Sequence, residues 1–263
     1  MNIMIITALF DIKRAEKGDG RSVNDYLQWF KETLKIKCDM TVYTEKRFEQ
    51  FVLDNRKDSN YKTRIIIQKF EEIPFYKNID RIDAILKDST YKSKIQDPNR
   101  IECYLPEYNV IQYSKFGWLK MAVNDCPEHD YFFWMDAGCS RFFEGFDLTK
   151  KWPNTRLLNK DKFIIQGNIN TPRLWNMVLQ EEYRWEKHCV VVGTLFGGGR
   201  DVLLKIHDIM ENVCEDRFFS KGCVNNEQIA LAIAAKLYPE IFEIRISPAV
   251  QYIHLPLFTE LSQ

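Results

Sequence analysis

A single aspartate follows a run of aromatic and apolar residues and is the first candidate for chemistry in this sequence. Residues 131–135, YFFWM, read as a strand buried on both faces, and Asp136 comes directly after them. A carboxylate at the end of a buried strand costs free energy unless another group pairs with it. Ligands of open α/β sheets bind at the carboxyl ends of the strands, and hard divalent cations prefer carboxylate oxygen. Asp136 is therefore a candidate ligand of a cation that carries a phosphate-bearing molecule, and pairing with nearby Arg141 is the alternative.

Small residues occur beside this aspartate and again in a later strand. Ala137 and Gly138 would let a diphosphate or a sugar approach the backbone closely. Residues 188–196, HCVVVGTLF, read as a strand that runs into the glycines at 197–199, and no phosphate-binding motif is present there. This pattern predicts either backbone packed close to a ligand or a mobile turn.

A second candidate carboxylate, Glu227, stands at the start of an expected helix. Residues 225–228, NNEQ, have the spacing of a helix cap, so part of this motif has a structural explanation. A carboxylate near a helix N-terminus is stabilised as an anion. We therefore expect a lowered pKa for Glu227 and an ionised side chain at neutral pH.

Short buried strands and amphipathic helices alternate along the chain and must position these groups. Strands are expected at residues 2–10, 40–44, 63–70, 131–135, 162–166, 188–196 and 241–247. Helices are expected behind a capping-box-like Ser22 and Asp25, and at residues 45–55, 79–86, 109–125, 200–213 and 226–238. The alternation predicts a mainly parallel sheet covered on both faces, and the absence of repeats and linkers predicts one domain.

Composition excludes several classes of protein. Lys plus Arg and Asp plus Glu are both 37, so the formal net charge of zero gives no support to broad nucleic-acid binding. No apolar stretch reaches membrane-spanning length, and the N-terminal residues lack the order of a secretory signal, so export is not expected. The seven cysteines are widely spaced without a C-x-x-C pair, which argues against a zinc site or a disulfide framework and favours a reducing cytoplasm.

Several segments together resemble one family. The segments ITALFDIKR, NVIQYSKFGWL, YFFWMDAGCSRFF, GTLFGGG and NNEQ resemble the HtrL/YibB-like family over nearly the whole chain. More broadly, the chain is similar to nucleotide-sugar-dependent glycosyltransferases of the GT-A type. The resemblance implies an α/β, GT-A-like (Rossmann-like) single domain over residues 1–263, with a mainly parallel central sheet flanked by helices. It also implies that residues 1–140 bind the nucleotide sugar and residues 141–263 bind the acceptor.

The resemblance implies a metal site at Asp136. GT-A enzymes usually hold Mn²⁺ or Mg²⁺ with an Asp-x-Asp motif, and the cation bridges the donor's two phosphates. Asp136 matches the first aspartate, but Gly138 stands where the last one is expected, which puts the need for metal in question. Many such enzymes complete the site with a late histidine, and His254 matches that position. A packing role for His254 beside its apolar neighbours is the alternative.

The resemblance also implies roles for other residues. Glu227 would hold a sugar hydroxyl or act as a base, and Lys115 would neutralise phosphate. Both are candidate catalytic residues. For several of the binding residues named next, a purely structural position at the surface or in the core is the alternative. The implied nucleotide-sugar-binding residues are Thr7, Ala8, Leu9, Asp11, Arg14, Ser114, Lys115, Asp136, Ala137, Gly138, Gly193 and Thr194.

These observations predict a metal-assisted glycosyltransferase that moves a sugar from a nucleoside-diphosphate donor to a glycan or lipid-linked glycan acceptor. The resemblance suggests cell-surface polysaccharide or lipopolysaccharide synthesis, in the cytoplasm or peripherally at the inner face of a membrane. A sugar nucleotidyltransferase is one alternative, although the segment LFDIKRAEKGDGR is poorer in glycine than such enzymes need. A non-catalytic protein that binds nucleotide sugars or glycans is the other alternative, because the second aspartate is missing.

Overall fold

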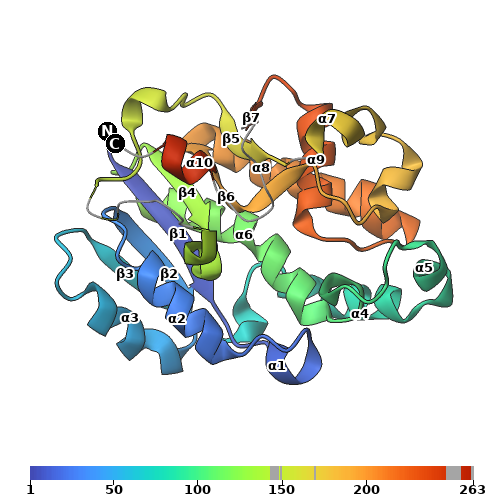
Figure 1. Ribbon diagram of the computed structural model, residues 1–263, viewed down its shortest axis with the longest axis horizontal. Helices are drawn as coiled ribbons and strands as arrows, with labels where there is room; N and C mark the ends of the chain where they lie inside the picture. The colour runs from blue at the N-terminus through green and yellow to red at the C-terminus, as the bar shows by residue number, and fades with distance from the viewer. Residues whose placement is uncertain (143–147, 149, 169, 247–255, 262–263) are drawn as a thin grey trace.

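The computed structural model describes the whole chain except residues 143–147, 149, 169, 247–255 and 262–263 (Figure 1). Its strands are β1 (Ile3–Leu9), β2 (Asp39–Thr44), β3 (Thr63–Ile67), β4 (Tyr131–Met135), β5 (Phe163–Gly167), β6 (Val191–Gly199) and β7 (Phe242–Arg245). Its α-helices are α1 (Arg14–Lys17), α2 (Val23–Thr33), α3 (Glu49–Arg56), α4 (Ile79–Lys87), α5 (Ser89–Lys94), α6 (Pro106–Asp125), α7 (Thr171–Leu174), α8 (Arg200–Val213), α9 (Glu227–Leu237) and α10 (Pro256–Glu260).

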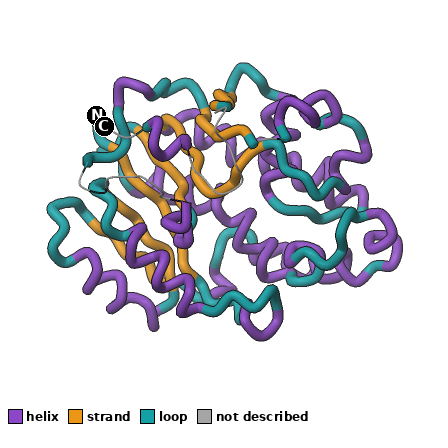
Figure 2. Tube along the Cα trace, in the orientation of Figure 1, coloured by secondary structure: helices purple, strands orange, loops and turns teal. Residues whose placement is uncertain are grey.

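The seven strands form one sheet in the order β3-β2-β1-β4-β6-β5-β7 (Figure 2). Strand β1 pairs in parallel with β2 and β4, and β2 pairs in parallel with β3. Strand β6 runs antiparallel to both β4 and β5, whereas β5 and β7 are parallel to each other. The predicted α/β domain with a mainly parallel sheet is therefore confirmed, and β6 is its one reversed strand among the described residues.

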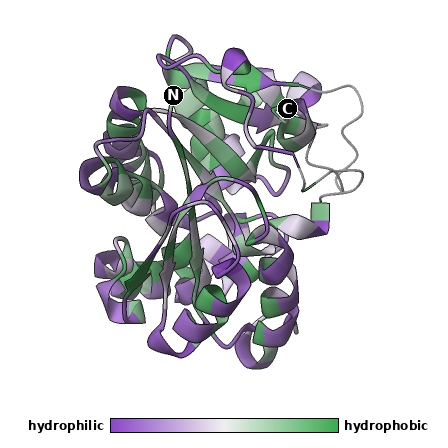
Figure 3. Cartoon of the chain, turned by 90° about the vertical axis from the view of Figure 1, so that its left-hand side faces the viewer, coloured by the Kyte–Doolittle hydropathy of each residue, from purple (hydrophilic) through white to green (hydrophobic). Residues whose placement is uncertain are grey.

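Both faces of the sheet are covered, because neighbouring residues of a strand point to opposite sides. Ile5 of β1 and Phe133 of β4 belong to an apolar cluster with residues of α2, α3 and α10. Ile6 and Trp134, each one position further along, belong to a second cluster with residues of α4, α6, α8 and α9. Figure 3 shows the apolar strands in the interior and hydrophilic residues on the outward faces of the helices.

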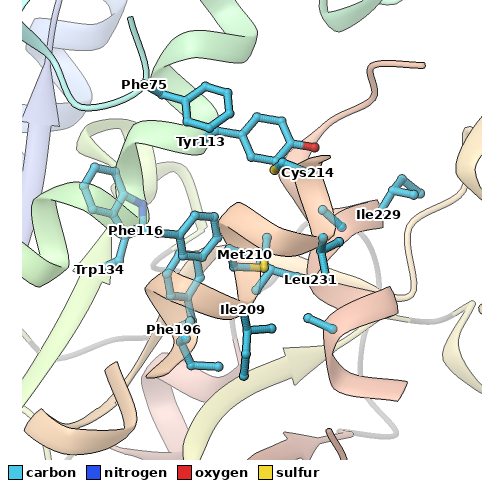
Figure 4. Close-up of a cluster of buried hydrophobic side chains, with 14 of the residues drawn as sticks. Phe75, Tyr113, Phe116, Trp134, Phe196, Ile209, Met210, Cys214, Ile229 and Leu231 are labelled. Carbon is cyan, nitrogen blue, oxygen red and sulfur yellow. The ribbon is translucent and has the colours of Figure 1, made fainter. Parts of the chain in front are cut away.

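Aromatic rings lock α6 against the sheet in the second cluster (Figure 4). The rings of Phe116 on α6 and Phe196 on β6 stack with their centroids 5.6 Å apart. Trp118 of α6 stacks on Trp134 of β4 at 5.7 Å, with the two planes only 5° apart. Stacked aromatic pairs add to the stabilisation from buried area, so the part of α6 that carries these two rings is held in a fixed frame. Lys115 directly precedes Phe116 in this part of the helix.

Helix α6 is unusual because it is buried along most of its length. It spans 20 residues, begins with Pro106 in its first turn, and contacts β1, β4, α8 and α9. Proline is favoured at this position because its missing N–H would have no partner within the helix. No helix in the described parts of the chain, α6 included, combines the length and the apolar character needed to span a membrane.

Two helix starts follow from local sequence. Ser22 and Asp25 form the predicted capping box at the start of α2, in which each side chain accepts from the other residue's backbone N–H. At α9 the cap is Asn226, whose side chain accepts from the backbone N–H groups of Gln228 and Ile229. The cap leaves Glu227 as the first residue of the helix.

The glycines at 197–199 form the end of β6, so of the two alternatives the turn is wrong and closely packed backbone is present. All three lie in the strand, where Gly197 and Gly198 pair with residues of both β4 and β5. A Cβ atom on Gly197 would lie 2.5 Å from Phe133 Cδ1, and one on Gly198 would lie 2.6 Å from the Lys162 carbonyl oxygen. The glycines therefore allow close packing of backbone and core rather than motion.

Candidate functional site

A buried lysine is the centre of the site. Lys115 of α6 is only 1% exposed. Its Nζ lies 3.0 Å from Asp136 Oδ1, 2.6 Å from Glu227 Oε1 and 3.0 Å from the Gly193 carbonyl oxygen. An ammonium group has three N–H donors, so these three oxygens match its full capacity. The structure thus brings together residues of α6, β6 and α9 and the turn after β4.

Asp136 lies between this lysine and open space. Its Oδ1 accepts a 2.7 Å hydrogen bond from Trp134 Nε1 in addition to the Lys115 ion pair. Its backbone N–H donates to the Thr194 carbonyl oxygen at 2.9 Å, which ties the turn to β6. The side chain of Asp136 remains 28% exposed. The partner of Asp136 is therefore Lys115, and Arg141, the alternative partner, instead donates from Nε to the Gly138 carbonyl oxygen.

Glu227 lies on the far side of Lys115. It is 2% exposed, and its Oε2 has no hydrogen-bond partner among the described residues. A Cβ atom on Gly193 would come within 3.0 Å of Glu227 Cδ and closer still to Oε1. Glycine at 193 therefore makes room for this carboxyl group next to the lysine.

Burial and mutual contact shift the pKa values of Glu227 and Lys115. Desolvation raises the pKa of Glu227 to about 7, although Lys115 acts in the opposite direction. The predicted lowered pKa is wrong, because removal of the carboxyl group from water outweighs its position at a helix N-terminus. Burial alone would lower the pKa of Lys115, but the carboxylates of Asp136 and Glu227 more than offset this, so its pKa is raised. The lysine is charged at neutral pH.

The raised pKa of Glu227 predicts a pH-dependent stability. Between about pH 4.5 and pH 7 the folded chain holds a proton on Glu227 that the unfolded chain has lost. Since the folded state binds more protons there, the free energy of unfolding falls as the pH rises through this window. The difference in free energy of unfolding between wild type and Glu227→Gln should fall by about 3 kcal/mol across it, measured by urea denaturation at a series of pH values.

In a matched control, the stability difference should change with pH in the opposite direction. The hydrogen bond from Arg81 lowers the pKa of Glu215, an exposed carboxylate remote from the cavity. Glu215→Gln should therefore lose stability relative to wild type as the pH rises through the ordinary range of a glutamate. A flat difference for Glu227→Gln would show that folding does not shift the pKa of its carboxyl group.

The site opens into a cavity at the carboxyl end of β1 and β4. The described residues that border it are Ala8, Leu9, Phe10, Asp11, Ile12, Arg14, Arg21, Val23, Tyr26, Tyr108, Ile111, Gln112, Lys115, Trp134, Asp136, Ala137, Gly138 and Arg141. Lys115 and Asp136 border it directly. Glu227 is not among the bordering residues that the structure describes, so it reaches the cavity only through Lys115.

Arg14 builds one wall of this cavity. Its guanidinium makes two hydrogen bonds to Asp19, at 2.6 and 2.7 Å, and donates to the Tyr26 hydroxyl at 2.6 Å. It also lies over the Tyr108 ring, 4.9 Å from the ring centre. The charge of Arg14 is therefore largely matched within the protein, and its position fixes two aromatic rings beside the cavity.

The other expected donor-site residues divide into two groups. Ala8, Leu9, Asp11, Ala137 and Gly138 border the cavity, and Thr194 lies on β6 next to Asp136. Thr7 and Ser114 are fully buried and lie outside the described lining. The hydroxyl of Ser114 accepts a 3.0 Å hydrogen bond from the Phe75 backbone N–H, which is a packing contact.

Reasoning from sequence missed one helix face. Tyr108, Ile111 and Gln112 border the cavity together with Lys115, and these positions follow the i, i+3, i+4, i+7 spacing of one helical face. This spacing is visible in the sequence once Lys115 is taken as the reference residue. Tyr26 and Arg141 were also not assigned to the donor site, and no local pattern marks them.

The described residues do not by themselves make up a site for a divalent cation. Among them, no group of three or more His, Cys, Asp or Glu side chains is placed to hold a metal. One oxygen of Asp136 is already bound by an ammonium and an indole N–H, and position 138 has no side chain. Mn²⁺ and Mg²⁺ prefer several oxygen ligands, so Asp136 Oδ2 alone is a poor donor set. His254, the expected second ligand, lies outside the described residues.

A solved structure of a glycosyltransferase shares this fold. Core-mannan synthase A from Aspergillus fumigatus, in its manganese and GDP form, matches with a TM-score of 0.54 and 10% identity, over 94% of this chain and 72% of its own. Mouse xyloside xylosyltransferase 1, apo form, matches with a TM-score of 0.44 and 9% identity, over 93% of this chain and 84% of its own. At such identity a match shows the fold alone.

A nucleotidyltransferase also matches, more loosely. The 4-diphosphocytidyl-2C-methyl-D-erythritol synthase from Anaerococcus prevotii has a TM-score of 0.38 and 10% identity, over 99% of this chain and 96% of its own. No curated protein matches the chain. One family model, described as "Bacterial protein of unknown function (HtrL_YibB)", matches residues 1–253. This match spans almost the whole sequence, and the chain therefore belongs to the HtrL_YibB family.

Proposed function

We propose that this protein is a glycosyltransferase that binds a nucleoside-diphosphate sugar in the cavity at the ends of β1 and β4 and transfers the sugar to a glycan acceptor. The observation that carries the proposal is the buried Lys115, held by Asp136 and Glu227 at the edge of a cavity lined by the end of β1. A buried cluster of titratable groups with shifted pKa values, at the carboxyl end of a sheet and beside a cavity, is typical of a functional site rather than of a stabilising core. In open α/β sheets such as this one, ligands bind at the carboxyl ends of the strands.

The cavity has the parts that a nucleotide sugar needs. The end of β1 offers small Ala8 and the polar Asp11, and Tyr26 and Tyr108 offer rings for a base or ribose. Asp136 and the small residues after it also border the cavity, and a diphosphate can approach their backbone closely. Residues 1–140 would thus bind the donor, and residues 141–263 would supply the acceptor side.

The chemistry is a substitution at the sugar carbon. The bond between this carbon and the diphosphate oxygen breaks and leaves its electron pair on the oxygen. The acceptor hydroxyl oxygen forms the new bond, and its proton passes to a base or to water. Fixed positive charge near the diphosphate stabilises the leaving group more as the bond breaks than before. Lys115 neutralises the charge of Asp136, so this carboxylate repels the diphosphate less, although the three N–H groups of the lysine are already engaged.

The proposed acceptor is lipopolysaccharide or a related cell-surface glycan. The divalent cation predicted at Asp136 and His254 stays a prediction on which the proposed donor site does not depend. The mannan synthase with a similar fold was crystallised with manganese and GDP. A thermal-shift screen of nucleotide sugars with and without manganese tests donor binding, because a ligand that binds only the folded state raises the unfolding temperature. No shift with any nucleotide sugar would exclude the donor site.

Asp136→Asn is expected to reduce donor turnover by about a hundredfold or more, because it keeps the shape of the side chain but removes the charge that holds Lys115 at the cavity. The measurement is release of free sugar or nucleoside diphosphate from the donor identified in the screen. Asp125→Asn, at an exposed ion pair with Arg64 at the end of α6, is the control and should retain turnover. Unchanged turnover in Asp136→Asn would place the reaction elsewhere, and release of pyrophosphate from a nucleoside triphosphate would favour the nucleotidyltransferase.

A further inference from the structure

The turn after β4 carries a fixed cation beside the glycine that replaces a second aspartate. Arg141 folds back over this turn, and its Nε donates to the Gly138 carbonyl oxygen at 2.9 Å. Its guanidinium carbon lies 4.5 Å from the ring centre of Trp29 and 5.0 Å from that of Phe142. Contacts with two rings and one carbonyl restrict the side chain, and it borders the same cavity as Asp136.

Position 138 faces this guanidinium. A Cβ atom on Gly138 would lie 3.5 Å from Arg141 Nε, 3.3 Å from Trp29 Cε3 and 3.4 Å from Tyr26 Cε1. The carboxylate of an aspartate at position 138 would therefore lie close to the positive charge of Arg141. Such a carboxylate would form an ion pair with the arginine instead of serving as a free metal ligand.

The charge of Arg141 is not matched by a carboxylate in the described part of the chain. Three arginines border the cavity. Arg14 lies 2.6 Å from an oxygen of Asp19, and Arg21 lies 3.5 Å from the other oxygen of the same carboxylate. Arg141 has no ion pair with any described residue. Lys115 is fully engaged, and Arg14 and Arg21 share the carboxylate of Asp19, so Arg141 is the arginine of the described lining that has no carboxylate partner.

We propose that the guanidinium of Arg141 binds the diphosphate of the donor, in the place that a metal held by a second aspartate would take. The proposal rests on the proposed function and concerns this one site. The planar fork of a guanidinium matches two phosphate oxygens and stays charged at every working pH. Its stacking between Trp29 and Phe142 holds the fork in position before the ligand arrives. Gly138 is then required because a carboxylate there would neutralise the arginine.

The test is isothermal titration with UDP, GDP, CDP, ADP and dTDP in the presence of EDTA, and again with manganese. Wild type should bind one or more of these nucleotides in EDTA, with an affinity within about threefold of that in manganese. Arg141→Gln should weaken the binding by ~10- to 100-fold in EDTA, the range expected for the loss of charged hydrogen bonds. Arg141→Lys should give only partial recovery, since an ammonium cannot form the fork.

Variants at position 138 provide a second, independent test. Gly138→Asp should weaken binding in EDTA, whereas Gly138→Asn, which has almost the same size but no charge, should weaken it less. Arg81→Gln is the matched arginine control, because Arg81 also lies over an aromatic ring, that of Phe219, but outside this cavity. It should bind like wild type. Thermal unfolding of each variant shows whether it is folded at the temperature of the titration.

The possible failures are distinct. Nucleotide binding that requires manganese and is unchanged in Arg141→Gln would overturn the role of Arg141 and leave the glycosyltransferase proposal standing. Tighter manganese-dependent binding by Gly138→Asp than by wild type would also overturn it, because the new carboxylate would then be a metal ligand. No binding of any nucleoside diphosphate by wild type, in EDTA or in manganese, would overturn both proposals.

Discussion

Replacement of Lys115 by methionine is expected to lower the free energy of unfolding by about 3–5 kcal/mol and to abolish donor binding. Methionine has nearly the length of lysine without its charge. The change leaves Asp136 and Glu227 facing each other across an apolar side chain, with no cation between them. Removal of one partner from a buried ion pair costs more than the pair contributes, because the remaining charge stays out of water. Chemical denaturation and nucleotide titration measure the two effects.

The control for this variant lies on the same helix. Lys120→Met removes a lysine of α6 that pairs with Asp208 at the surface and is 38% exposed, so it should cost at most about 1 kcal/mol. A double variant, Lys115→Met with Glu227→Gln, should recover stability only at alkaline pH, because the pKa of Glu227 rises further without Lys115 and its carboxyl group is already neutral at lower pH. Donor binding should not return. A loss for Lys115→Met no larger than that for Lys120→Met would mean that the cluster is solvated.

Much of the fold was predictable because its signals are local. Alternation of short apolar runs with amphipathic segments predicted the positions of the strands and helices, and the Ser22–Asp25 box predicted the start of α2. The direction of β6 was not predictable, because a buried strand has the same apolar pattern in either direction. The choice between a turn and close packing at 197–199 could not be made for a related reason. Glycine marks both turns and close packing, and only the neighbouring strands decide between them.

The site was predictable as a set of candidates but not as an arrangement. Asp136 stood out because a carboxylate ended a buried strand. That Lys115 contacts both Asp136 and Glu227 depends on how α6 lies between β4, β6 and α9, which are far apart in sequence. The pKa of Glu227 was wrong for the same reason, since the helix N-terminus is a local effect whereas burial is a property of the assembled core.

The absence of a side chain at position 193 is expected to matter as much as the charges around it. Gly193→Ala should lower the free energy of unfolding by about 3 kcal/mol, because the new methyl group overlaps the Glu227 carboxyl group and forces it away from Lys115. The buried lysine then loses its shortest contact, the 2.6 Å bond to Glu227 Oε1. Donor binding should weaken as well, since Lys115 also holds Asp136 at the cavity.

A double-mutant cycle separates this effect from a general intolerance of alanine in β6. Glu227→Ala removes the atom that the methyl group would overlap most and leaves only the flexible Gln228 side chain, whose Cγ would lie 3.0 Å away, so adding Gly193→Ala to it should cost less than about 1 kcal/mol. Gly222→Ala is the backbone control, because Gly222 has a positive φ of 61° and open space around it. It should cost about 1 kcal/mol through backbone strain and leave nucleotide binding unchanged. Additive costs for Gly193→Ala and Glu227→Ala would mean that position 193 constrains the strand itself. A strongly non-additive pair would mean that the glycine is there to seat the carboxyl group against Lys115.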